Sequence, residues 1–275
     1  MADDRQGGGE ERRPRRAPSA GASRGGPRDR RGAPPTSGPH RARQSQPRRQ
    51  DDDHRPTGPR LPADIDAKQL SPEVRGELIT LDKTTADYVA RHLVAAGNLL
   101  EDDPAAALEH ARAARARAAR IAAVREAVGI AAYHCGDWAQ ALAELRAARR
   151  MGSRSPLLAL IADCERGVGR PERALELARS ADAEALTGDD AEELRIVVAG
   201  ARSDLGQFEQ ALAVLSSPPL DPTRTGQTAA RLHYALAETL LALGRSDEAL
   251  QSFMRAAAAD VDDVTDAEER IAELG

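Results

Sequence analysis

The apolar and polar positions of this chain form a unit that predicts a helical hairpin. An apolar stretch such as residues 127–133 predicts a helix, and the glycine that follows, Gly136, can end a helix in the left-handed conformation. A second helix is predicted a few residues later, with a small residue, Ala141, and a larger one, Leu145, four positions further on. The small residue allows the two helices to approach closely, and the larger residue fills the space beside it.

This unit recurs along the chain. Its second alanine stands at positions 107, 141, 174, 211 and 249, so the successive steps are 34, 33, 37 and 38 residues. The two longer steps contain turn-forming residues at 187–190 and 216–222, which predict enlarged loops between repeats. Ala111 and Ala178 occupy the position of the larger residue in two copies, which predicts looser packing there.

Helix-capping signals suggest where the repeat region and its two capping helices begin and end. Three pairs place a capping side chain before a proline at the first helical position, and they are Ser71-Pro72, Asp103-Pro104 and Ser155-Pro156. Residues 265–268 form a capping-box pattern before a short final helix. We therefore expect an N-terminal capping helix and linker over 61–84, repeats over 85–262 and a C-terminal capping helix over 263–275.

The repeat resembles the tetratricopeptide repeat (TPR) family over roughly residues 85 to 260. In the best copy the signature positions hold Val128, Gly129, Ala131, Gly136, Ala141, Leu145 and Ala148. The family's Trp near the start of the first helix is absent, and its aromatic positions are mostly Ala, Arg or Leu. The chain is also similar to actinobacterial members of the family. The resemblance implies an all-α, right-handed α-solenoid of about five TPR-like helical hairpins, with a short C-terminal capping helix, preceded by a disordered arm.

The predicted arm is residues 1–60, and its composition differs from that of the remaining chain. It carries 15 Arg, no Lys and 8 acidic residues, whereas residues 61–275 carry 24 basic and 36 acidic residues. Gly, Pro, Ser, Gln and Arg dominate the arm, and Met1 is its only large apolar residue, so it cannot bury enough surface to offset the entropy of ordering. Arg outnumbers Lys 37 to 2 in the whole chain, which is typical of a GC-rich bacterial genome and weakens a functional interpretation of arginine.

The sequence contains no motif that indicates catalysis, a cofactor or a metal. Gly167-Val-Gly169 lies on the turn of the repeat and not after a strand, and the acidic residues at 260–268 lack the glycine of a calcium loop. Cys135 and Cys164 are expected to be buried free thiols, too far apart for a disulfide. No apolar stretch is long enough to span a bilayer or resembles a secretory signal, so a cytoplasmic location is expected.

The resemblance also implies a partner-binding groove on the concave face, which the first helix of each repeat lines. The groove positions, transferred one at a time, are His92, Glu126, Ile130, Tyr133, His134, Asp163, Arg166, Ile196, Asp204, Arg231, Tyr234, Glu238 and Leu241. Four acidic residues stand against two arginines in this set, so we expect a mildly acidic groove that favours a basic peptide. The alternative interpretation is that these polar residues are only solvated.

A non-enzymatic scaffold for protein or peptide binding is the leading functional prediction, because stacked hairpins make an extended surface and no reactive constellation is present. The alternative is an RNA- or DNA-associated protein in which the Arg-rich arm contacts phosphates, although the arm has no aromatic residue to stack on bases. A third possibility is a regulatory subunit of an enzyme. The arm also offers basic segments, such as residues 12–16, that could dock on the acidic repeats, or it could serve only as a solubilising tail.

Overall fold

The computed structural model describes residues 58–275, and within this range the chain is helical with no β-strand. The predicted all-α architecture of about five hairpins is therefore confirmed. The predicted arm lies almost wholly outside the described residues, and the predictions that depend on it stay predictions.

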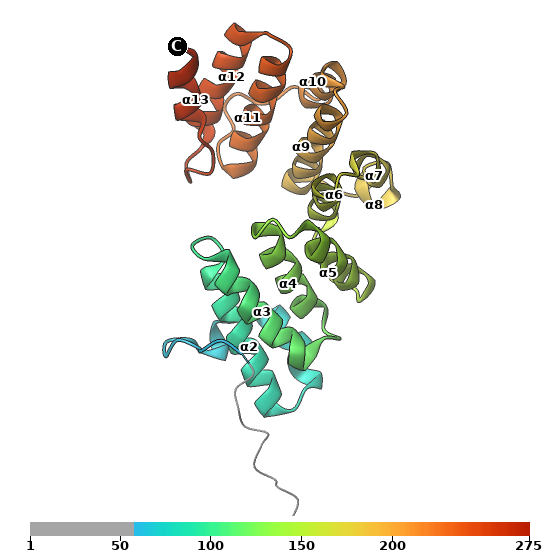
Figure 1. Ribbon diagram of the computed structural model, residues 1–275, viewed down its shortest axis with the longest axis vertical. Coiled ribbons are helices and arrows are strands. Elements are labelled where there is room, and N and C mark those ends of the chain that lie inside the picture. Colours follow the sequence, from blue (N-terminus) through green and yellow to red (C-terminus); the bar gives the residue numbers. More distant parts are fainter. Residues whose placement is uncertain (1–57) are drawn as a thin grey trace, which may run out of the picture. The chain divides into compact units, whose positions relative to one another are not determined.

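Ten of the helices form five consecutive pairs, and in each pair the chain reverses direction between the two helices (Figure 1). The pairs are α2 (Lys83–Leu99) with α3 (Pro104–Ala118), α4 (Ala122–His134) with α5 (Trp138–Arg150), α6 (Leu158–Gly167) with α7 (Pro171–Leu177), α9 (Gly188–Asp204) with α10 (Phe208–Ser216), and α11 (Gln227–Ala242) with α12 (Ser246–Ala259). A short N-terminal segment precedes them and comprises η1 (Ala67–Gln69), α1 (Pro72–Glu77) and η2 (Leu78–Thr80). The final helix, α13 (Ala267–Leu274), packs on α12.

The turn inside four of the five pairs has the same geometry. The glycines at positions 136, 169, 206 and 244 have φ values of 70°, 74°, 69° and 72°. In each turn the residue after the glycine donates its N–H to the carbonyl five residues earlier, at 2.8–2.9 Å, as Asp137 does to Ala132. This 6→1 bond satisfies a carbonyl at the helix end, and the positive φ explains why glycine recurs there.

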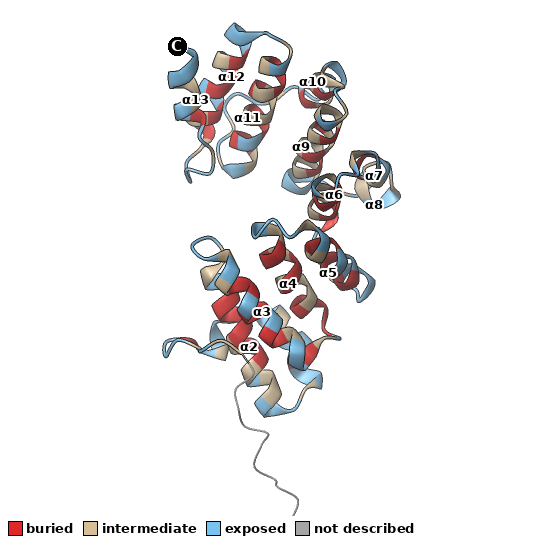
Figure 2. Cartoon of the chain, viewed as in Figure 1, coloured by how far each residue is buried: buried red, intermediate tan, exposed pale blue. Residues whose placement is uncertain are grey.

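The recurring alanines lie where the two helices of a pair meet. Ala107, Ala141, Ala174, Ala211 and Ala249 are all fully buried, and so are the larger residues Leu145, Leu215 and Phe253. Gly129 on α4 brings the helices of the second pair closest, because a Cβ atom at this position would lie 2.7 Å from the Leu145 side chain. Figure 2 shows buried and exposed residues alternating along the longer paired helices, as expected where a helix packs on one side.

The capping predictions are only partly confirmed. The Ser71 and Asp103 side chains accept the N–H groups of Val74 and Ala106, as expected. The Ser155-Pro156 prediction is wrong, because α6 begins at Leu158 and the Ser155 hydroxyl donates to Glu126 instead. The capping box at 265–268 is also wrong, because Thr265 uses its hydroxyl and its N–H to bind Asp260.

The two enlarged connections differ from each other. Residues 217–226 form a loop between α10 and α11, close to the prediction. The other insertion is not a loop at 187–190, because Gly188 already begins α9. The additional residues instead form a short helix, α8 (Ala181–Glu184), whose N-terminus the Ser180 hydroxyl caps.

Buried carboxylates tie successive hairpins together. Glu144 on α5 pairs with Arg115 on α3 and, at 2.7 Å, with Arg125 on α4. Glu165 on α6 pairs with Arg146 on α5. Each carboxylate is almost fully buried while its arginine partners remain partly exposed, so the charges are compensated where the hairpins stack.

Candidate functional site

A chain of polar contacts links the first helices of three consecutive hairpins. The Tyr133 hydroxyl on α4 donates to Asp163 Oδ2 on α6 at 2.6 Å. The Arg166 guanidinium on α6 donates to Asp163 Oδ1 at 2.7 Å and, with two nitrogens, to the Asp204 carboxylate on α9 at 2.8 and 3.1 Å. These four residues, here called the central ladder, are all in the predicted groove set, and the fold brings them into contact.

Two further ion pairs extend the same arrangement toward the C-terminus. Arg231 on α11 pairs with Glu193 on α9 at 2.7 Å. Glu238 on α11 pairs with Arg270 on α13 at 2.7 Å. The first helices from α4 to α11 and the capping helix are thus joined pairwise by side-chain contacts.

Burial and hydrogen bonding shift the titration of the ladder groups. Burial, together with the neighbouring Asp163 carboxylate, raises the pKa of Tyr133, so its phenol stays protonated and donates. Burial disfavours the charge of Arg166, but the carboxylates of Asp204 and Asp163 outweigh this effect and raise its pKa. Tyr133 and Arg166 therefore both stay protonated at neutral pH and donate to the aspartates.

A shallow cavity of about 290 Å³ lies over the ladder, and Trp138 of α5 lines it together with Asp163, Arg166, Gly167 and Asp204. Trp138 stacks against Gly167, where a Cβ atom would lie 2.4 Å from the indole ring. Gly200 has the same role beneath Arg166, where a Cβ atom would lie 2.4 Å from the guanidinium carbon. Both positions need glycine because a side chain approaches the helix backbone closely.

His92 does not lie on this surface, and its assignment to the groove is wrong. Its ring is 1% exposed, and its Nδ1 lies 2.9 Å from Nδ1 of His110 on α3. The ring also packs against Tyr88, with the centroids 4.3 Å apart. Tyr88 on α2 and His110 on α3 pack against the His92 ring, so His92 belongs to the core of the first hairpin.

The remaining predicted residues lie on α4, α9 and α11. His134 is exposed, and Ile130, Ile196, Tyr234 and Leu241 are partly buried. Glu126 accepts hydrogen bonds from the hydroxyls of Ser153 and Ser155 at 2.8 and 2.6 Å. Burial and a hydrogen bond to Asp266 raise the pKa of Tyr234 to about 12.

The electrostatic basis for a basic partner is weaker in the structure than in the sequence. Asp163 and Asp204 share Arg166, and Glu238 pairs with Arg270, so three of the four carboxylates are paired with arginines. Glu126 accepts only from the neutral hydroxyls of Ser153 and Ser155. The sequence prediction missed Glu193, Arg270 and Trp138. Trp138 stands two residues after the turn glycine of its repeat, and this spacing could have identified it. Glu193 and Arg270 stand outside the groove positions that were transferred from the family.

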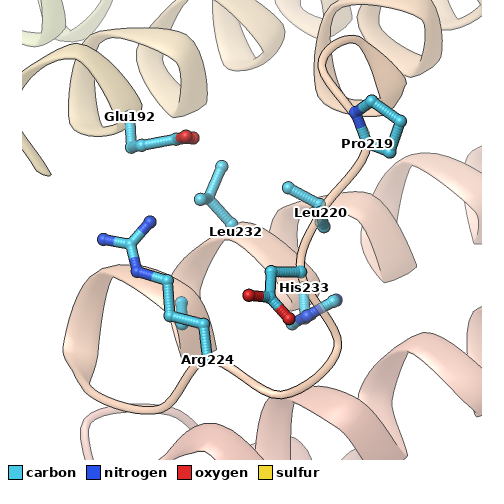
Figure 3. A pocket seen from close by; sticks show the side chains of 8 residues that line it. Glu192, Pro219, Leu220, Arg224, Leu232 and His233 are labelled. Carbon is cyan, nitrogen blue, oxygen red and sulfur yellow. The ribbon is translucent and has the colours of Figure 1, made fainter. Parts of the chain in front are cut away.

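A second, smaller cavity of about 110 Å³ lies between α9, the 217–226 loop and α11, where Glu192, Leu232, Arg224 and His233 converge (Figure 3). His233 is 3% exposed, and its Nδ1 has no hydrogen-bond partner in the part of the chain that the structure describes. A volume of this size holds a few water molecules and is below that of a small-molecule site.

Residues 58–275 contain no group of three His, Cys, Asp or Glu side chains placed to hold a metal ion. Both cysteines are free; Cys164 is buried as expected, but Cys135 is exposed, because it follows the last residue of α4 at the surface. None of the helices in this range is both long and apolar enough to cross a membrane.

Comparison with known proteins agrees with the hairpin geometry. Residues 158–267, which span α6 to the start of α13, match the family model described as Tetratrico peptide repeat. Residues 158–267 are therefore assigned to the tetratricopeptide repeat (TPR) family. The first two hairpins lie outside the matched residues, yet the pair α4–α5 has the same glycine turn and buried alanine as the TPR units that follow.

Among solved structures, the chain is similar to the crystal structure of YrrB, titled as a TPR protein with an unusual peptide-binding site. The identity is 16%, the TM-score is 0.43, and the match covers 72% of this chain and 97% of YrrB. No curated protein sequence matches the chain.

Proposed function

We propose that this TPR protein is a non-enzymatic scaffold that binds a protein or peptide on the face formed by α4, α6, α9 and α11. The observation that carries the proposal is the central ladder, which joins three of these helices through Tyr133, Asp163, Arg166 and Asp204. A surface held by such contacts is preorganised, so a partner loses little free energy in ordering it. Partly buried Ile196 and Leu241 supply apolar contact area on the same helices.

The proposal predicts that a charge placed on this face removes binding. Ile196→Arg combined with Leu241→Arg is expected to reduce partner capture by about tenfold or more, because a guanidinium there cannot be desolvated against an apolar partner surface. The measurement is affinity capture with the full-length chain from lysate of its source organism, quantified by mass spectrometry.

Ala139→Arg is the matched control, since Ala139 is exposed on α5, which is not among the helices of the proposed face, and does not line the cavity over the central ladder. It is expected to leave capture within about twofold of the wild type. Thermal unfolding by circular dichroism checks that both variants remain folded. Equal capture by the folded double variant and the control would contradict the proposed face.

A further inference from the structure

The cavity over the central ladder carries a negative charge that the ladder itself does not neutralise. Its lining contains two carboxylates, those of Asp163 and Asp204, against one guanidinium, that of Arg166. Arg166 pairs with both carboxylates, but its single positive charge balances only one of them. No other basic side chain of residues 58–275 forms an ion pair with either aspartate. One negative charge therefore remains in excess in the lining.

The carboxylates of the ladder keep acceptor positions free for a ligand. Each of their four oxygens accepts one hydrogen bond within the described part of the chain, from Tyr133 or from Arg166. A carboxylate oxygen has two lone pairs, so each oxygen can accept a second donor. The Asp204 side chain is 37% exposed, so a donor has access to it from the solvent.

Trp138 gives the same cavity an aromatic wall. Its indole packs on the backbone of α6 at Gly167, which fixes its position. Tyr133 meets the indole edge-on, with the ring centroids 5.1 Å apart and the ring planes at 77°. The face of an aromatic ring attracts a cation because its π electrons are negative. An aromatic wall beside carboxylates is therefore suited to a positively charged side chain.

The charges of the wider face favour the same kind of ligand. Glu126 keeps its negative charge because its donors are neutral hydroxyls, and the two ion pairs that α11 makes are balanced. An acidic ligand would add charge of the same sign, and an apolar side chain would remove charged groups from water without replacing their hydration. Arginine is the best match, because a planar guanidinium both stacks on a ring and donates two parallel hydrogen bonds to a carboxylate.

We propose that the cavity over the central ladder binds an arginine side chain of the partner peptide. The guanidinium stacks on the indole of Trp138 and donates to the carboxylate of Asp204, which makes the lining neutral. A volume of about 290 Å³ suits one side chain and is too small for a larger ligand. This inference rests on the proposed scaffold function and deepens it, because it assigns one residue type of the partner to a defined position on the proposed face.

The experiment selects a displayed library of random peptides on the full-length chain and measures the dissociation constant of a synthetic, fluorescein-labelled winner by anisotropy. Arginine is expected to be enriched at one position of the selected peptides. Replacing this arginine by citrulline, which is neutral and nearly identical in shape, is expected to weaken binding by about tenfold or more. Replacing it by lysine is expected to cost less than citrulline, because an ammonium keeps the charge but lacks the planar fork.

Asp204→Asn removes the charge at almost constant shape. It is expected to weaken binding of the arginine peptide by about tenfold and to leave binding of the citrulline peptide within about twofold. A merely structural role of Asp204 would weaken both peptides alike. Asp102→Asn is the matched control, because Asp102 is exposed in the turn between α2 and α3 and does not line the cavity, and it is expected to bind both peptides as the wild type does.

Trp138→Leu tests the aromatic wall while it keeps an apolar side chain. It is expected to weaken binding of the arginine peptide by about fivefold or more, since the cation loses its contact with the ring. Trp138 is the single tryptophan of the chain, so the unlabelled winner is expected to change the intrinsic fluorescence of the wild type with the same dissociation constant. Circular dichroism checks the fold, and if Trp138→Leu is unfolded, the citrulline peptide and Asp204→Asn still decide.

The absence of arginine enrichment, equal binding of the arginine and citrulline peptides, or unchanged affinity of Asp204→Asn or of folded Trp138→Leu would each overturn the inference. Partner capture that is lost with Ile196→Arg and Leu241→Arg but is unaffected by Asp204→Asn would keep the proposed function and reject only this arginine site.

Discussion

Acidification from about pH 7 to about pH 4 is expected to lower the free energy of unfolding by roughly 3 kcal/mol through His92 alone. Burial, with smaller contributions from the charges of His110 and Arg91, lowers the pKa of His92 to about 4 from an ordinary value of 6.5. The unfolded chain therefore binds a proton near pH 6.5 that the folded chain does not accept until about pH 4. Stability from His92 is complete above pH 6.5 and is lost progressively as the pH falls toward 4.

The other two buried histidines act in the same direction. Burial lowers the pKa of His110, and burial together with Arg255 lowers that of His233. The first and fifth hairpins are therefore both expected to lose stability in acid. Because stacked repeats can unfold in parts, hydrogen exchange at α2 and α11 should be followed beside circular dichroism.

The acid prediction is checked by removing the titrating group. His92→Phe keeps a buried ring, and it should narrow the difference in unfolding free energy between pH 7 and pH 4 by roughly 3 kcal/mol. This variant also removes the partner of the His110 ring, and it does so at both pH values. The comparison therefore uses the difference in unfolding free energy between pH 7 and pH 4 and not the stability at either pH. His134→Gln, at an exposed position, serves as the control and should leave the difference unchanged. An identical pH dependence of His92→Phe and wild type would contradict the prediction.

Arg195→Ala is expected to lower the free energy of unfolding of the fourth hairpin by about 3 kcal/mol. The Arg195 side chain is only 10% exposed, and it donates to the carbonyls of Val214 and Leu215 at the end of α10 and to that of Pro218 in the following loop. The bonds to Val214 and Pro218 measure 2.8 and 2.5 Å. Arg195 supplies the side-chain hydrogen bonds at these three carbonyls, so alanine would leave them without a charged donor.

Urea unfolding followed by circular dichroism measures the loss, with hydrogen exchange of α10 to locate it. Arg173→Ala is the control, because Arg173 is exposed and its one ion pair within residues 58–275 is with Glu176 one turn away, a contact that contributes less than about 0.5 kcal/mol. Arg195→Lys should fall between the two, since an ammonium cannot reach three carbonyls with the geometry of a guanidinium. Equal stability of Arg195→Ala and Arg173→Ala would show that the carbonyls are satisfied without Arg195.

Local features of the sequence predicted the hairpins because each signal acts within one turn of helix. A glycine at positive φ, a buried alanine and a larger residue four positions later act together wherever they recur, so Gly136, Ala141 and Leu145 were correctly placed. Caps were less predictable. Ser155 matches the capping pattern, yet its hydroxyl is used by Glu126, 29 residues earlier in the chain.

The candidate site was predictable in its positions but not in its electrostatics. Transfer from the TPR pattern found Tyr133, Asp163, Arg166 and Asp204, which the fold brings into one ladder. The i,i+3 pair of Asp163 and Arg166 on α6 is a local contact, but the pattern could not show that Arg166 also pairs with Asp204, which is 38 residues away and is brought near by the packing of α9 on α6. The same reasoning placed His92 on a surface that the first hairpin buries.

The sequence by itself determined the repeat, its period and the residues at the turn and at the close helix contact, since these depend on backbone conformation and side-chain size within each hairpin. Only the tertiary structure decided which charges remain available, because an ion pair between hairpins depends on distances that no local pattern encodes. Arg166 and Asp204 show this division: both are charged in the sequence, but only the packing of α6 against α9 joins them in an ion pair.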